Sequence, residues 1–159
     1  MKVIKNVLGN ADDIRNAFIK ANYEQQDQSE EGYSCRFKRS FELEKTPLFH
    51  EFGEKLCSVL QAVEPIGDTA IVNAYKMEEG DYFRTHDDKT NGRGFVYYLC
   101  KDWDWDWGGI LMMKHRDSML PILPKFNHLL IMDFGVPHFV TPVMKYAKEP
   151  RYAMVGFIH

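Results

Sequence analysis

Three side chains in this sequence could together hold a metal ion: His86, Asp88 and His138. His86 and Asp88 flank a single residue within Tyr82–Asp88, and residues spaced in this way point to the same side of an extended strand. One imidazole and one carboxylate therefore converge from one rigid segment. A second histidine would complete the two-histidine, one-carboxylate set that suits non-haem Fe(II) and leaves coordination positions open. His138, within Val136–Val140, is the candidate if the fold brings a distant strand beside the first.

The composition fits one globular domain. A chain of 159 residues can bury a core without disulfides or metals, and 45% hydrophobic with 14% aromatic residues is typical of an aromatic-rich β protein. The net charge is −3, the isoelectric point lies near 6.1, and there is no long basic run. Since nucleic-acid binding depends on a positive surface, we expect no nucleic-acid partner.

The cysteines and the N-terminal residues bear on location. Cys35, Cys57 and Cys100 are an odd number without a CxxC pair, which is typical of free thiols in a reducing compartment. No stretch resembles a signal peptide, and none approaches the roughly 20 apolar residues of a membrane span. The expectation is therefore a cytoplasmic protein with no membrane partner.

Helical signals are confined to the first part of the chain. Asn10 can cap a short helix with apolar residues at helical spacing up to Ala21, and Thr46-Pro47 begins a longer one that Pro65–Gly67 should end. Residues 23–32 are polar and lack periodicity, so they are predicted to form a mobile loop that could act as a lid.

Short segments rich in β-branched and aromatic residues follow, separated by turn signals. They are Thr69–Tyr75, Asp81–Asp88, Gly94–Cys100, Gly109–Lys114, His128–Phe134 and Tyr152–Ile158. Helices followed by many short strands predict a mainly β fold with N-terminal helices (α+β), a double-stranded β-helix or jelly roll. We expect one domain over residues 1–159, with a helical support region over 1–66 and a jelly-roll core over 67–159.

From about Ala70 to Phe157 the chain resembles the Fe(II)/2-oxoglutarate-dependent dioxygenases. Within them it is similar to the prolyl 4-hydroxylase-like group, which includes the hypoxia-sensing prolyl hydroxylases. The resemblance rests on the order and spacing of several short motifs. They are Tyr75 and Gly80 before His86-Asp87-Asp88, Val96-Tyr97-Tyr98-Leu99 with Lys101-Asp102-Trp103, Gly108-Gly109-Ile110-Leu111, Pro124-Lys125-Phe126-Asn127, Pro137-His138-Phe139-Val140 with Pro142, and Arg151-Tyr152-Ala153.

This resemblance implies a role for each candidate residue. His86, Asp88 and His138 would be the iron ligands, and Arg151 would pair with the far carboxylate of 2-oxoglutarate. A guanidinium suits that task because it offers a two-pronged fork to a carboxylate and stays charged. Tyr98 would help to hold the same carboxylate, and Tyr75 would lie near the metal-bound end of the cosubstrate. In each tyrosine the alternative is an aromatic core residue whose hydroxyl reaches the rim.

The resemblance also implies an activity. It would be hydroxylation of an unactivated C–H bond with Fe(II), 2-oxoglutarate and O2, releasing succinate and CO2, with ascorbate as a candidate reductant. The group points to a prolyl residue of a peptide or protein as substrate. A free amino acid or another small metabolite is the alternative, since a chain of this length leaves little surface for docking. A third reading is a non-catalytic jelly-roll binding protein.

Two further motifs could be functional. His115-Arg116-Asp117 with Asp133–Gly135 imitates a protein kinase, but Ile122 stands where a kinase needs asparagine for Mg2+, and no Gly-rich loop opens the chain. This histidine and aspartate are expected in a solvated turn. Lys101–Trp107 alternates acid and tryptophan, so an extended conformation would separate them onto two faces. The segment then either covers the core or forms a lip facing a cationic or extended peptide substrate.

Overall fold

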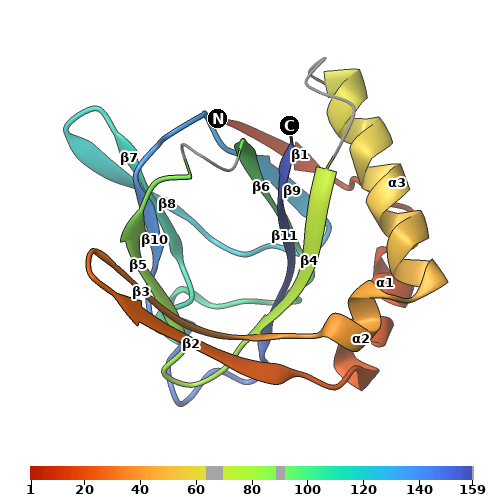
Figure 1. Cartoon of the computed structure of the whole chain (residues 1–159), viewed down its shortest axis with the longest axis horizontal. Helices are drawn as coiled ribbons and strands as arrows, with labels where there is room; N and C mark the ends of the chain where they lie inside the picture. The colour runs from red at the N-terminus through yellow and green to blue at the C-terminus, as the bar shows by residue number, and fades with distance from the viewer. Residues whose placement is uncertain (64–69, 89–91, 159) are drawn as a thin grey trace.

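An antiparallel β-sheet dominates the computed structural model, which describes residues 1–63, 70–88 and 92–158. Among these residues it runs in the order β1-β9-β6-β11-β4-β3-β5-β10-β7-β8, with β2 paired to β3, and it curls into an open barrel (Figure 1). The strands are β1 (Lys2–Lys5), β2 (Glu24–Glu30), β3 (Tyr33–Arg39), β4 (Ala70–Met77), β5 (Tyr82–His86), β6 (Arg93–Tyr98), β7 (Leu111–His115), β8 (Ser118–Ile122), β9 (His128–Ile131), β10 (His138–Val140) and β11 (Arg151–Ile158). The predicted mainly β fold with N-terminal helices is confirmed.

Three helices lie on the outside of one wall of the barrel, beside β4 (Figure 1). They are α1 (Ala11–Lys20), α2 (Phe41–Glu44) and α3 (Pro47–Val63). The predicted start of α3 is confirmed: Thr46 Oγ1 accepts a hydrogen bond from Phe49 N at 3.2 Å, and Pro47 takes the first position, where no partner for its nitrogen is needed. The predicted end at Pro65–Gly67 lies outside the described residues. None of the helices in the described ranges is long and apolar enough to cross a membrane.

The sheet separates two hydrophobic clusters because side chains alternate along each strand. On β6, Tyr97 faces the helices and packs with Phe18 and Leu56, while Tyr98 faces the barrel interior with Met77. The outer cluster fastens the helices to the sheet. The inner cluster borders the candidate site, because Val96, Leu111 and Val140 belong to both.

The centre of the inner face is set by β11, which pairs with β4 on one side and β6 on the other. Ala153 is the Cα partner of both Tyr75 and Tyr98, so the two tyrosines flank one small side chain. Arg151, two positions earlier on the same strand, shares that face and is the Cα partner of Met77. The register therefore brings three of the predicted site residues into one row of neighbours.

The prediction of a mobile loop over residues 23–32 is wrong. These residues contain β2, whose partner along its whole length is β3, for example Gln28 with Cys35 and Gln26 with Phe37. Nearly all side chains of β2 are exposed, so the strand has no alternation of hydrophobic and polar residues. For this reason the sequence pattern did not predict it. Residues 1–66 thus contribute strands as well as helices.

Candidate functional site

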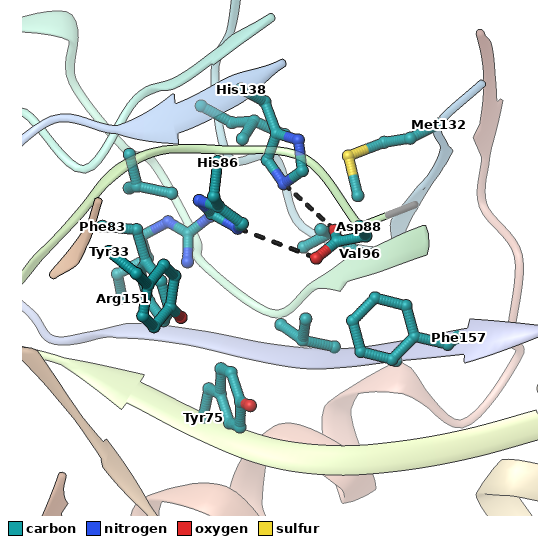
Figure 2. A pocket seen from close by; sticks show the side chains of 14 residues that line it. Tyr33, Tyr75, Phe83, His86, Asp88, Val96, Met132, His138, Arg151 and Phe157 are labelled. Carbon is teal, nitrogen blue, oxygen red and sulfur yellow. Dashed lines mark ion pairs between the residues drawn. The ribbon is translucent and has the colours of Figure 1, made fainter. Parts of the chain in front are cut away.

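The fold brings the two distant histidines together. His138 of β10 is the Cα partner of His86 of β5, and their ring centroids lie 4.3 Å apart. Asp88, just past the end of β5, completes the group, with Oδ2 3.4 Å from His138 Nε2 and Oδ1 3.9 Å from His86 Nε2. The candidate ligand atoms lie within 4.8 Å of one another, and Figure 2 shows them converging. This arrangement of two imidazoles and one carboxylate could hold a metal ion with open positions on one side.

Local hydrogen bonds fix the orientation of both imidazoles. His86 Nδ1 lies 2.7 Å from the carbonyl oxygen of Arg84, and His138 Nδ1 lies 2.8 Å from that of Val136. Because a carbonyl oxygen can only accept, each Nδ1 carries the proton and each Nε2 keeps a free lone pair directed toward Asp88. Burial also lowers the pKa of His138, which favours the neutral form that a metal requires.

A cavity of about 230 Å³ opens beside this group. Its wall is largely aromatic and aliphatic. Besides the metal group, it is lined by Tyr33, Tyr75, Phe83, Val96, Leu111, Met132, Val140, Arg151, Val155, Gly156 and Phe157 (Figure 2). Tyr75 and Phe83 lie nearly parallel, at 9° and 6.2 Å, and Tyr33 meets the His86 ring edge-on at 5.4 Å. A mainly apolar pocket with few polar groups is typical of a small-ligand site.

Arg151 brings a buried positive charge into this cavity. Its side chain is 3% exposed; Nη1 donates to the weak acceptor Met77 Sδ at 3.4 Å, and Nε has no hydrogen-bond partner. In the described part of the chain no carboxylate forms an ion pair with it. Since a buried charge without a counterion is costly, the site fits an anionic ligand whose carboxylate the guanidinium could bind.

The two predicted tyrosines lie on either side of β11. Tyr75 lines the cavity, whereas Tyr98 lies next to Arg151, with the guanidinium carbon 5.2 Å from its ring centroid. The Tyr98 hydroxyl is buried without a hydrogen-bond partner, and Tyr98 is not among the described residues that line the cavity, so it joins the candidate site through its neighbour Arg151. Burial raises the pKa of Tyr98 to about 12, an effect that Arg151 partly opposes, and burial likewise raises the pKa of Tyr75 to about 12.

The kinase-like motif His115-Arg116-Asp117 does not line the cavity, and it is exposed to solvent as expected. His115 ends β7 and Asp117 lies in the turn before β8, both exposed. The tryptophan segment differs from its prediction, because it is not extended: a 3-10 helix, η1 (Trp105–Trp107), follows Asp104, whose side chain accepts from Asp106 N. Trp103 is buried in the inner cluster, whereas Trp105 is 57% exposed. The burial of Trp103 agrees with the reading in which this segment covers the core. Among the described residues that line the cavity there is no tryptophan, so the alternative reading of a lip is not supported.

Phe83 shows what strand alternation could not predict. It is separated from His86 by an odd number of steps, so a regular strand would place the two on opposite faces. The register between β10 and β5 shifts instead: His138 pairs with His86 while Val140 pairs with Phe83. This irregularity turns both side chains toward the cavity. Tyr33 was also not predicted as a site residue. It lies against the His86 ring only because β3 pairs with β5, which the sequence does not reveal.

Comparisons with known proteins agree with this geometry. Three of the solved structures with a similar fold align with 99% of this chain. They are a Pseudomonas putida prolyl-4-hydroxylase (TM-score 0.72, 17% identity, 91% of that chain), a Trichoplax adhaerens prolyl hydroxylase in complex with a hypoxia inducible factor oxygen degradation domain peptide fragment (0.74, 17%, 82%), and a viral collagen prolyl hydroxylase from Paramecium Bursaria Chlorella virus-1 (0.62, 16%, 94%). At these identities the likeness shows the fold, and it confirms the jelly roll.

Sequence comparison gives the family. No curated protein matches the chain in sequence. The sequence model of the 2OG-Fe(II) oxygenase superfamily matches residues 70–159, which contain the two histidines, Asp88 and Arg151. This match covers more than half of the length, and the chain therefore belongs to the 2OG-Fe(II) oxygenase superfamily.

Proposed function

We propose that this enzyme hydroxylates a prolyl residue in a peptide or protein. Its superfamily uses Fe(II), 2-oxoglutarate and O2. The observation that carries the proposal is the presence, in one cavity, of the His86–Asp88–His138 group and a buried arginine without a counterion. The similarity of the fold to three prolyl hydroxylases supports the choice of substrate.

The proposed roles follow from the geometry. His86, Asp88 and His138 would hold Fe(II), Arg151 and Tyr98 would hold the far carboxylate of 2-oxoglutarate, and Tyr75 would lie near its metal-bound end. When bound, iron and cosubstrate supply the oxidising chemistry, in which 2-oxoglutarate and O2 yield succinate, CO2 and one oxygen atom for the substrate carbon.

The chain itself contributes orientation and the exclusion of water. The carbonyls of Arg84 and Val136 hold the imidazole rings so that both Nε2 atoms face Asp88. Arg151 fixes the far end of the cosubstrate, since a fork-shaped cation determines both position and direction of a carboxylate. The aromatic wall keeps the reacting carbon in an apolar environment.

The charges in the cavity favour a residue within a peptide over a free amino acid. Among the described lining residues, the charged or chargeable groups other than tyrosines are the metal group and Arg151. All of these are assigned to iron and cosubstrate. A free amino acid would leave its ammonium and carboxylate unpaired, which is costly in an apolar site, whereas a prolyl ring packs against Tyr75 and Phe83. The intact metal group together with Arg151 argues against a non-catalytic binding protein.

Three further proposals complete this assignment. Residues 1–159 would act as one domain, in which residues 67–159 form the catalytic jelly roll and residues 1–66 support it. The cysteines of the described residues are free thiols, two of them buried, which supports a cytoplasmic location. Ascorbate would serve as the reductant that restores Fe(II).

Peptide screening tests the proposed substrate. The protein would be incubated with Fe(II), 2-oxoglutarate, O2 and either proline-containing peptides, the same peptides with alanine in place of proline, or free amino acids. We expect succinate release coupled to a gain of one oxygen atom in the proline-containing peptides alone. Oxygen on free amino acids but not on peptides would support the alternative substrate. Succinate release equal in wild type and His86→Ala would contradict catalysis altogether.

A further inference from the structure

The tryptophan segment between β6 and β7 lies close to Arg151, the residue proposed to bind the far carboxylate of 2-oxoglutarate. Trp103 is 6% exposed, and its Nε1 donates to the carbonyl oxygen of Gly108 at 2.9 Å. Trp107 packs edge-on against it, with ring centroids 5.2 Å apart. The indole of Trp103 is therefore held in one orientation by its own turn, which Gly108 and Gly109 close.

Gly109 is the point at which this turn meets Arg151. Its φ is +61°, and a Cβ placed there would lie 3.0 Å from Arg151 Cδ, 3.2 Å from Trp103 Cζ2 and 3.3 Å from Val143 Cγ2. Three side chains from separate segments thus converge over one α-carbon that carries no side chain. A methyl group at position 109 would press on the stem of the arginine, which would have to shift by a few tenths of an ångström.

The same turn is tied to the segment that follows His138. Gly109 N donates to Thr141 O at 3.2 Å, Ile110 N donates to Thr141 Oγ1 at 3.0 Å, and Met144 N donates to Trp107 O at 2.9 Å. Gly108 approaches Pro142 so closely that a Cβ on residue 108 would lie 2.0 Å from the carbonyl oxygen of Pro142. The turn is consequently fixed to the backbone that carries one of the proposed iron ligands.

We infer that Trp103 and Gly109 are positioning residues for the 2-oxoglutarate anchor: they confine the stem of Arg151 so that its guanidinium stays beside Tyr98 and faces the cavity. This inference rests on the proposed function. A free arginine stem samples many rotamers, and restricting it lowers the cost of binding a carboxylate. The guanidinium beyond the stem lies beside the Tyr98 ring and donates to Met77 Sδ.

Binding without turnover separates this role from a general structural one. Mn(II) would replace Fe(II), and affinities would be measured by calorimetry for two ligands: 2-oxoglutarate, which has a far carboxylate, and oxalate, which chelates the metal but has none. We expect Trp103→Ala to weaken 2-oxoglutarate binding about tenfold and to leave oxalate binding within about twofold of wild type. Trp103→Phe, which keeps an aromatic ring, should retain most of the affinity.

Trp105→Ala is the matched control, because this tryptophan belongs to the same segment but is exposed. It should bind both ligands like wild type. In turnover, Trp103→Ala should raise the KM for 2-oxoglutarate by about the same tenfold while kcat changes little. Equal weakening of both ligands, or unchanged binding of both, would overturn the inference.

A second pair of variants covers the case in which Trp103→Ala does not fold. Gly109→Ala introduces a methyl against Arg151 Cδ, whereas Gly80→Ala imposes the same kind of left-handed strain (φ +78°) with nothing within 4 Å of its Cβ. Weaker 2-oxoglutarate binding in Gly109→Ala alone supports the inference, and equal effects in both variants contradict it. If the wild type bound oxalate but not 2-oxoglutarate, the proposed function itself would fail before any variant was compared.

Discussion

His138 and His86 are direct Cα partners across β10 and β5, although more than fifty residues separate them in the sequence. The pairing places their rings 4.3 Å apart and both Nε2 atoms beside Asp88. The two histidines of this site lie on paired strands and are therefore held rigidly by the sheet, while Asp88 follows directly after β5. The predictions below start from this rigidity.

Removing one ligand should abolish metal binding without unfolding the protein. We expect His86→Ala to reduce Fe(II) affinity at least about 100-fold, because even partners of metal ligands contribute up to that factor. Metal content after dialysis and the thermal melting curve measure the two effects. His115→Ala, an exposed histidine at the end of β7, is the control and should keep its iron. Retention of full iron content by His86→Ala would disprove the assigned ligand set.

Replacing the guanidinium of Arg151 by another cation of different shape should impair the binding of 2-oxoglutarate but not that of Fe(II). Arg151→Lys removes the two-pronged fork, so we expect the KM for 2-oxoglutarate to rise about tenfold or more with Fe(II) binding unchanged. Tyr98→Phe removes one donor and should produce a smaller rise. Steady-state kinetics and metal titration measure these effects. A parallel loss of iron in Arg151→Lys would show that its role has been misplaced.

The contribution of Tyr98 should not depend on pH in the ordinary working range. Burial raises its pKa from 10.0 to about 12, so the hydroxyl keeps its proton, and can donate to a carboxylate, well above neutrality. The ratio of 2-oxoglutarate KM values between Tyr98→Phe and wild type should therefore stay constant from about pH 6 to about pH 9. A ratio that falls toward one between pH 8 and 9 would indicate a phenol whose pKa lies well below its ordinary value.

Two glycines should respond to alanine in opposite ways. Gly53 lies inside α3, where a Cβ would meet only Val72 Cγ2 at 3.8 Å, so Gly53→Ala should stabilise the protein by about 0.5–1 kcal/mol. At Gly156 of β11 a Cβ would lie 1.8 Å from Ile71 O of the paired β4. Gly156→Ala should therefore destabilise by about 2 kcal/mol or more. Urea unfolding measures both changes, and equal signs would contradict the packing described.

Local patterns in the sequence were enough to select the three candidate metal ligands that the structure brings together. The spacing of His86 and Asp88, the proline at the start of α3 and the β-branched and aromatic content of β4, β6 and β11 are properties of a few neighbouring residues, and each prediction of this kind agrees with the structure. The jelly roll followed from the order of such segments. The polar strand β2 was missed for the converse reason: both of its faces meet solvent, so nothing in its composition distinguishes it from a loop.

Only the tertiary structure decided how distant segments meet. The register shift that turns Phe83 toward the cavity, the place of Tyr33 over His86, and the convergence of Trp103 with Arg151 over Gly109 depend on strand pairing and on turns closed by long-range hydrogen bonds. The alternating tryptophans suggested an extended segment, but the Asp104 cap and the two glycines fold it into a helical turn. Residue type and spacing thus specify which atoms can react, whereas packing across the sheet fixes where they stand.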